Sequence, residues 1–295
     1  GRSLESRCEE FVTMLEATIT NATKYCHATR PQARVPFDGP VLLNFVPYKD
    51  GYRGAGRVGS MSLSDQVHIY DLDSSFNVTD TRHATKGEDP RAFLFREHPY
   101  AYIVDPHPDE DGQHVFSYKV LDLISGETKI LSIDHFPTTP VQALGKNWIP
   151  FEKDGELYFI ITIEPHVTIL HCNLETSFCT WVTPLELVSN GLKITISRGS
   201  TPMMFSKTHD LFFGIGHRTY DCNNHSAYLY TLSKDFKKSY VGPDIPIDTS
   251  YPLSDAVSLF EEKGKIWSCI AQYPCQLGDT AVATCSLYEV KLNEL

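Results

Sequence analysis

An acidic pair stands directly before a proline in the stretch GEDPRAF, residues 87–93, where a proton-transferring group could be fixed in place. Glu88 and Asp89 are followed by Pro90 and Arg91. Proline fixes its own φ and disfavours the helical region for the preceding residue, so Asp89 is expected in an extended or turn conformation. A carboxyl group held in this way can transfer a proton, and the plain alternative is a solvated surface turn.

Polar and charged residues gather beside apolar runs at several further points of the chain, in the stretches GYRGAGRVGS, GKNWIPF, SRGSTPMM, GIGHRTY and YPLSDAVSLF. Each stretch alone fits a solvated loop, a β-bulge or a core position. Their similar phase within the repeats described below favours a shared pocket. Around Asp89, we therefore expect these binding residues: Tyr52, Arg53, Arg57, Glu88, Arg91, Lys146, Asn147, Arg198, His217 and Asp255.

No metal site and no cofactor are expected from the sequence. The histidines His83, His107, His114 and His135 show no ligand spacing. The acidic stretch DPHPDEDG, residues 105–112, could attract calcium, but it reads more simply as a solvated loop between strands. GAGRVG, residues 54–59, matches the G-x-G-x-x-G pattern of a dinucleotide-binding loop, but it lies in a β-rich region with no expected helix after it.

The start of the chain predicts a helix. In SLESRCEEFVTMLEATITNATKYC, Ser6 and Glu9 fit a capping box, and Phe11, Leu15 and Ile19 follow at a spacing of four. Beyond residue 34 the chain turns into short runs of β-forming residues broken by Gly, Asp, Asn and Pro. We therefore expect a helix and lead-in over residues 1–34 and one β domain over residues 35–295.

The β region repeats itself. Stretches such as LFREHPYAYIVD and PFEKDGELYFIIT each place a polar turn between two apolar runs. The repeats align on Tyr52, Tyr102, Leu157, Leu211 and Ile266, at steps of 50, 55, 54 and 55 residues. A period near 50 with several strands per repeat is typical of a β-propeller. The sequence predicts an all-β, five-bladed propeller, with a β-sandwich as the second choice.

Composition limits the compartment and the partners. The chain has 295 residues and a net charge of −11, which argues against nucleic acid and against an anionic membrane surface. Eight cysteines without a C-x-x-C pair predict disulfides of undetermined pairing: Cys8, Cys26, Cys172, Cys179, Cys222, Cys269, Cys275 and Cys285. Glycosylation sequons at Asn21, Asn77 and Asn224 add to the expectation of a secreted or lumenal glycoprotein.

Three motifs in order, GEDPRAF, GKNWIPFEKDGELYFI and RGSTPMM followed by LFFGIGH, resemble the five-bladed propellers of glycoside hydrolase family 130. That family includes β-mannoside phosphorylases and related β-1,2-mannosyltransferases, and the resemblance covers about residues 42–272. It implies that Asp89 is the general acid, acting through a sugar hydroxyl. It also implies hydrogen bonds to sugar or phosphate from Tyr52 and Asn147, and a phosphate site drawn from Arg53, Lys146, Arg198 and His217.

The resemblance leaves the reaction open. The expected partner is an oligosaccharide or glycan, with phosphate or a sugar nucleotide as a co-substrate. A hydrolase would need a second carboxylate as base, for which Asp255, Glu152 and Glu164 are available. A secretory compartment favours a transferase or a hydrolase over a phosphorylase. The alternative outside enzymes is a lectin-like or interaction propeller that has lost turnover. In GIGH, the tyrosine that the family places before the histidine is missing.

Overall fold

The computed structural model describes residues 15–26, 41–58, 66–112, 114–134, 146–164, 167–183, 197–221, 224–245, 253–273 and 284–294. All regular elements in these ranges are strands. The first sheet contains, outward from the axis, β2 (Val41–Tyr48), β3 (Gly51–Val58), β4 (Gln66–Leu72) and β5 (Val78–Lys86). The second contains β6 (Glu88–Phe95), β7 (His98–Pro108), β8 (His114–Asp122) and β9 (Thr128–Ile130).

The third sheet contains β11 (Ile149–Lys153), β12 (Glu156–Thr162), β13 (Thr168–Asn173) and β14 (Phe178–Trp181), with β10 (Ser132–Ile133) parallel to β14. In the fourth, β15 (Ser197–Arg198) and β16 (Met204–Ser206) both pair with β17 (Leu211–Asp221), followed by β18 (Asn224–Ser233) and β19 (Ser239–Asp244). The fifth contains β20 (Leu253–Glu262), β21 (Lys265–Tyr273), β22 (Thr284–Glu294) and β1 (Leu15–Cys26). A parallel pairing of β18 with β20 joins the fourth and fifth sheets.

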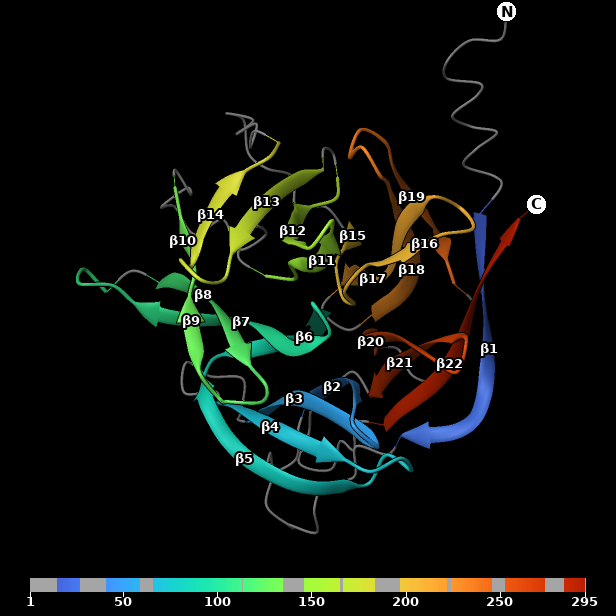
Figure 1. Ribbon diagram of the computed structural model, residues 1–295, viewed down its shortest axis with the longest axis horizontal. Coiled ribbons are helices and arrows are strands. Elements are labelled where there is room, and N and C mark those ends of the chain that lie inside the picture. The colour runs from blue at the N-terminus through green and yellow to red at the C-terminus, as the bar shows by residue number, and fades with distance from the viewer. Residues whose placement is uncertain are drawn as a thin grey trace, which may run out of the picture.

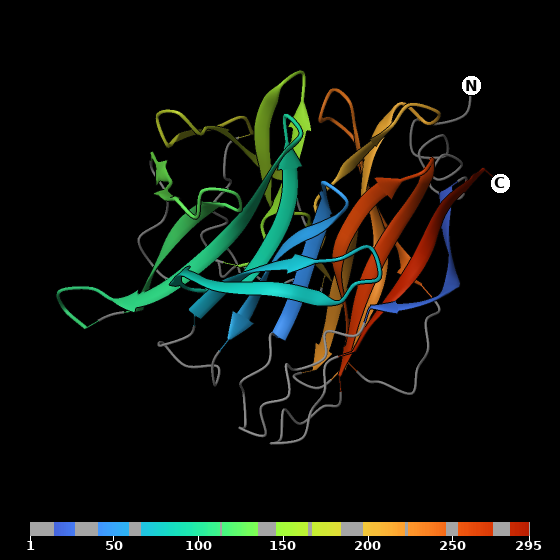
Figure 2. The same cartoon turned by 60° about the horizontal axis from the view of Figure 1, so that its bottom comes forward.

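The sheets stand around a common axis as the blades of a propeller, and Figures 1 and 2 show them in sequence order around it. The five residues on which the repeats align all lie in the second strand of their blade, in β3, β7, β12, β17 and β21. This confirms the predicted period. It arises because each blade begins with the same unit, an inner strand, a tight turn and an antiparallel second strand.

The hydrophobic core is divided among the interfaces between neighbouring blades. Five clusters of buried residues join blades one and two, two and three, three and four, four and five, and five and one. The second interface contains Trp148, which is fully buried between the rings of Tyr102 and Tyr118 at centroid distances of 5.1 and 4.3 Å. Since each sheet is covered by its neighbours on both faces, the ring supports the inner strands rigidly.

Residues 15–26, the second half of the expected N-terminal helix, form strand β1, so this part of the prediction was wrong. Residues 1–14 lie outside the described part of the chain. Strand β1 pairs antiparallel with β22 from Leu15 opposite Glu294 to Cys26 opposite Cys285. The run Thr18-Ile19-Thr20 is β-branched and favours a strand, and β22 offers its edge hydrogen bonds. Although β1 precedes residue 35, it completes the fifth blade.

One disulfide joins Cys172 to Cys179 across the hairpin of β13 and β14, as the spacing CNLETSFC suggested. Cys269, buried in β21, is also disulfide-bonded. Of the three sequons, Asn77 is exposed in the turn before β5, and its amide donates to Asp73. In the described ranges, no helix has the length and apolar character that a membrane span requires.

Candidate functional site

A β-bulge at the start of β6 presents the acidic pair. The register between β6 and β7 shifts between Glu88 and Arg91, and Asp89 has a positive φ of 50°. Gly87, just before the bulge, has a φ of 146°, and a Cβ there would lie 2.9 Å from the Val104 carbonyl oxygen. Only glycine fits this close approach, and bulges of this kind commonly re-aim a side chain at a functional site. The residues GEDP therefore form a shaped bulge rather than a free surface turn.

Asn44 of β2, in the first blade, holds the bulge from behind. Its side-chain amide donates to the Pro90 carbonyl oxygen at 2.7 Å, and its carbonyl oxygen accepts from the Ala92 backbone amide. Asn44 is fully buried. One side chain thus satisfies a donor and an acceptor of the irregular backbone, which would otherwise be buried without partners.

Two cations from neighbouring blades bind the acidic pair. Arg57 of β3 bridges the two carboxylates, with Nη2 2.8 Å from Glu88 Oε2 and Nη1 2.9 Å from Asp89 Oδ1. Lys146, just before β11, contacts Glu88 Oε1 and lies 3.9 Å from Asp89 Oδ2. The Arg57 and Glu88 side chains are 7% and 8% exposed, whereas Lys146 is 32% exposed. We call these four residues, from three blades, the acid–base cluster; its solvent side is Lys146.

Asp89 is ionised in the free site. Burial, the largest influence, raises the pKa of its carboxyl group, but the positive charges of Arg57, Lys146 and Arg91 together hold that pKa below its usual value. The cations therefore outweigh desolvation. Removing one of them, or excluding more water, shifts this balance toward the protonated acid.

Arg91 of β6 is 2% exposed, and its charge acts on Asp89 of the acid–base cluster. Its Nη2 donates to Asn147 Oδ1 at 3.3 Å, while its Nε and Nη1 have no hydrogen-bond partner within the described ranges. Asn147 has a positive φ of 63°. A buried guanidinium with two unused donors can receive an oxyanion or a sugar hydroxyl.

A second group of site residues lies where blades four and five meet. Ser200 Oγ is 2.7 Å from Nδ1 of His217, and Asp255 Oδ1 is 3.9 Å from the same nitrogen. Burial lowers the pKa of His217 to about 4, with Arg91 and Arg198 acting in the same direction and Asp255 opposing them. Arg198 of β15 is the antiparallel partner of His217 in β17. His217 is thus a neutral imidazole at neutral pH.

Two residues expected in the pocket are placed elsewhere, which corrects the sequence interpretation. The Tyr52 ring packs in the core on Phe76, at a centroid distance of 4.6 Å, and its hydroxyl donates to Glu262. Arg53 forms an ion pair with Asp71 and donates to a backbone carbonyl of the second blade. Both lie at the start of β3, whereas Arg57 lies near its end and reaches the acid–base cluster. Among the carboxylates considered as a hydrolase base, Glu152 accepts a hydrogen bond from the backbone amide of Arg96.

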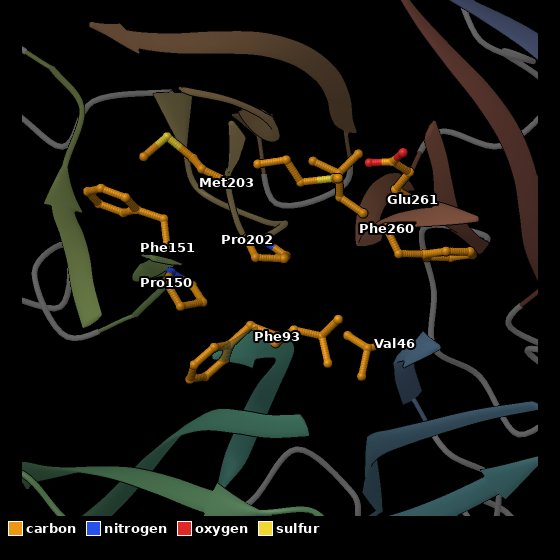
Figure 3. A pocket seen from close by; sticks show the side chains of 11 residues that line it. Val46, Phe93, Pro150, Phe151, Pro202, Met203, Phe260 and Glu261 are labelled. Carbon is orange, nitrogen blue, oxygen red and sulfur yellow. The ribbon is translucent and has the colours of Figure 1, made fainter. Parts of the chain in front are cut away.

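An apolar cavity of about 200 Å³ lies further along the axis, away from the acid–base cluster. Its lining comes from all five blades, with Val46, Phe93, Pro150, Pro202 and Phe260 among the side chains that surround it in Figure 3. The acidic pair begins β6 and Asp255 is near the start of β20, whereas the cavity residues stand toward the ends of these inner strands. The polar residues therefore gather toward one end of the axis, the apolar ones toward the other.

Sequence reasoning missed Asn44 and His225. Asn44 is the lone polar residue in the apolar run VLLNFV, and a buried amide in such a run signals a backbone contact that needs both a donor and an acceptor. His225 follows His217 across the β17–β18 hairpin, and Nδ1 of its ring is 3.0 Å from Asp255 Oδ1. The sequence signal for His225 was the hairpin of β17 and β18, because its antiparallel pairing brings residue 225 close to residue 217.

No family model matches the sequence, and no curated protein matches it. Among solved structures, the α-L-arabinofuranosidase from Podospora anserina, in complex with cellotriose, has a TM-score of 0.60 at 9% identity, over 95% of this chain and 98% of that one. The exo-β-1,3-galactanase from Phanerochaete chrysosporium, with β-1,3-galactotriose, gives 0.59 at 10% identity, over 95% and 66%.

A GH43 protein from Bacillus licheniformis has a TM-score of 0.54 at 12% identity, over 89% of this chain. This chain spans 53% of that protein and 54% of a xylan β-1,4-xylosidase from Bacillus halodurans, about half of each. At such identities the likeness concerns the fold alone. The chain folds as an all-β, five-bladed propeller that resembles the GH43 and related glycosidase propellers.

Proposed function

We propose that the protein is a carbohydrate-active enzyme that cleaves or forms a glycosidic bond, with Asp89 as the proton-transferring carboxylate. The observation that carries the proposal is the acid–base cluster: a carboxylate on a bulge, bridged by Arg57 and open to solvent on the side of Lys146. Glycosidic cleavage needs a proton for the leaving oxygen at a fixed position, and a rigid, partly buried carboxyl group provides it.

Substrate binding converts Asp89 into an acid in this proposal. A sugar hydroxyl that takes the place of the partly exposed Lys146 ammonium removes one cation from Asp89 and excludes water. Both changes raise the pKa of a carboxyl group that burial already favours in its neutral form. Asp89 then gives its proton, through that hydroxyl, to the leaving oxygen, while a nucleophile attacks the anomeric carbon.

The substrate class rests on two supports. Solved structures of the same fold include an exo-β-1,3-galactanase with galactotriose and an arabinofuranosidase with cellotriose, so an oligosaccharide is the proposed ligand here. The motifs around Asp89, Asn147 and His217 resemble those of family 130, and this makes a mannoside the first sugar to test. The Cys172–Cys179 disulfide agrees with a secretory-pathway protein.

Product analysis with purified protein tests the proposal. Manno-oligosaccharides of both anomers are supplied with and without phosphate, and GDP-mannose with simple acceptors. We expect a product from the wild type and a loss of about 10²–10⁴-fold in Asp89→Asn, which keeps the shape but cannot give a proton. The control is Asp71→Asn, a carboxylate paired with Arg53 outside the cluster, which should retain activity. Sugar binding without any turnover would support a lectin-like propeller and refute the enzyme.

A phosphorylase is the second candidate, and Arg91 is the observation that favours it. Its Nε and Nη1 are buried without a partner in the described ranges, and the charges of Arg91 and Arg198 both act on His217, an environment suited to an oxyanion. Phosphate-dependent formation of a sugar phosphate, lost in Arg91→Met, would establish this reaction. Release of free sugar without phosphate would establish a hydrolase, and elongated glycans a transferase.

A further inference from the structure

Three metal-ligating side chains converge where blades four and five meet. His217 lies in β17, His225 in β18 and Asp255 at the start of the inner strand β20. The hairpin of β17 and β18 brings the two histidines together, with ring centroids 5.1 Å apart, and the parallel pairing of His225 with Leu253 brings in β20. His217 and Asp255 are 5% and 4% exposed.

We propose that these three residues bind a divalent transition-metal cation of the zinc class. Asp255 Oδ1 is 3.0 Å from Nδ1 of His225 and 3.9 Å from Nδ1 of His217, and one donor atom of each residue lies within 4.8 Å of the others. Zinc holds nitrogen and oxygen ligands at about 2.0–2.2 Å, which in a tetrahedron sets them roughly 3.3 Å apart. These two distances bracket that spacing, so the Asp255 carboxylate already lies near ligand spacing from both imidazoles.

The donor set fits zinc chemically as well as in position. Two imidazoles and one carboxylate are the protein ligands of many zinc sites that keep a fourth position open. Other histidine–carboxylate contacts in the described part of the chain are simple pairs. His171 with Glu156, at 2.9 Å, is one of them, and both of its side chains are more than a third exposed. His217, His225 and Asp255 thus differ from these simple pairs in having a third possible ligand and in being more buried.

The charges around the site decide what completes it. Arg91 and Arg198 both act electrostatically on His217 and oppose a bare cation. They favour an anion, such as hydroxide, in the open position. The Ser200 hydroxyl stands 2.7 Å from His217 Nδ1, on the side where the cation would sit, and must release that nitrogen on binding. The zinc proposal needs none of the acid–base cluster, but it shares His217 with the oxyanion environment proposed for a phosphorylase.

Zinc titration tests the site. The wild-type protein, treated with a chelator and then dialysed, is titrated with zinc chloride in a calorimeter at pH 7.5. We expect one equivalent to bind, with a Kd at least about tenfold weaker in His225→Ala and in Asp255→Asn. The matched control, His171→Ala, removes the histidine of the simple pair and should leave the Kd unchanged. Binding that resists Asp255→Asn, or that falls with His171→Ala instead, would overturn the proposal.

A spectroscopic measurement on the wild type keeps the test decisive if a variant does not fold. Cobalt(II) replaces zinc, and its visible absorption reports the coordination number. An intense four- or five-coordinate spectrum at one equivalent, bleached by added zinc, is expected. A weak spectrum like that of hydrated cobalt would refute the site, whatever activity the protein has on sugars.

Discussion

Replacing Arg57 by glutamine should destabilise the protein strongly at neutral pH and much less in acid. The guanidinium of Arg57 is 2.8 Å from Glu88 and 2.9 Å from Asp89, and all three side chains are at most 15% exposed. Removing one partner of a buried ion pair costs about 3–5 kcal/mol. Lys146 still faces both carboxylates, so we expect a loss near the lower end, about 3 kcal/mol. With a urea m-value of about 3 kcal/mol/M, the midpoint falls by about 1 M.

The pH dependence follows from Asp89. In the wild type its pKa is below the usual 3.8, so its contribution to stability is present above that value and is lost as pH falls through the folded-state pKa. In Arg57→Gln, one of the positive charges that counteract the effect of burial on Asp89 is gone, so the folded-state pKa of Asp89 rises. The folded variant therefore binds a proton at Asp89 as pH falls. The difference between the two proteins should therefore shrink between pH 7 and pH 4.

Urea denaturation at pH 7, 5.5 and 4 measures this difference. The control is Arg53→Gln, in the same strand β3, whose partner Asp71 is 30% exposed; its loss should be about 1 kcal/mol or less and nearly independent of pH. A gap between wild type and Arg57→Gln that is below about 1 kcal/mol at pH 7, or equal at all three pH values, would refute the electrostatic account.

Three further changes test the support of the site. Asn44→Ala leaves the Pro90 carbonyl and the Ala92 amide buried without their hydrogen-bond partner. The free energy of unfolding, measured by urea titration, should fall by about 2–5 kcal/mol. An unchanged value would show that Asn44 does not stabilise the bulge. Gly87→Ala forces a Cβ toward the Val104 carbonyl at a φ of 146°, and thermal melts should show a clear drop in Tm. Gly155→Ala has the backbone strain of a positive φ, 75°, but its Cβ meets open space, so its drop in Tm should be smaller. Trp148→Ala empties the aromatic stack and should cost about 3–5 kcal/mol, and a loss below 1 would mean that the interface repacks.

The blades were predictable because their signal is local and repeated. Each inner hairpin carries its own turn residues and apolar runs, so the alignment on residues such as Leu157 and Leu211 located the second strand of each blade. The start of the chain failed for the opposite reason. Ser6, Glu9 and the spacing of Leu15 and Ile19 are local helix signals, whereas β1 owes its conformation to β22, far away in the sequence.

The site was predictable in its members more than in its contacts. Pro90 indicated an extended or turn conformation at Asp89, and the structure has a bulge there. Which cations face Asp89 depends on three blades meeting, and no spacing along the chain records that. Tyr52 and Arg57 share one glycine-rich stretch, but they lie near opposite ends of β3, so sequence proximity grouped residues that the strand separates.

The charges of the site link anion binding at Arg91 to the protonation of Asp89. Arg57, Arg91 and Lys146 face the carboxylates Glu88 and Asp89, which leaves an excess of positive charge in a chain whose net charge is −11. That excess of positive charge keeps Asp89 ionised.

Phosphate or another anion can accept hydrogen bonds from Nε and Nη1 of Arg91. Its negative charge then also cancels part of the effect that the Arg91 guanidinium has on the pKa of Asp89. Because burial favours the neutral acid, the carboxyl group then gains its proton as the nucleophile binds. In a phosphorylase of this design, phosphate binding would therefore add to the effect that sugar binding has on the pKa of Asp89. A hydrolase built on the same residues has the displacement of Lys146 and the exclusion of water, without an anion at Arg91, to raise the pKa of Asp89.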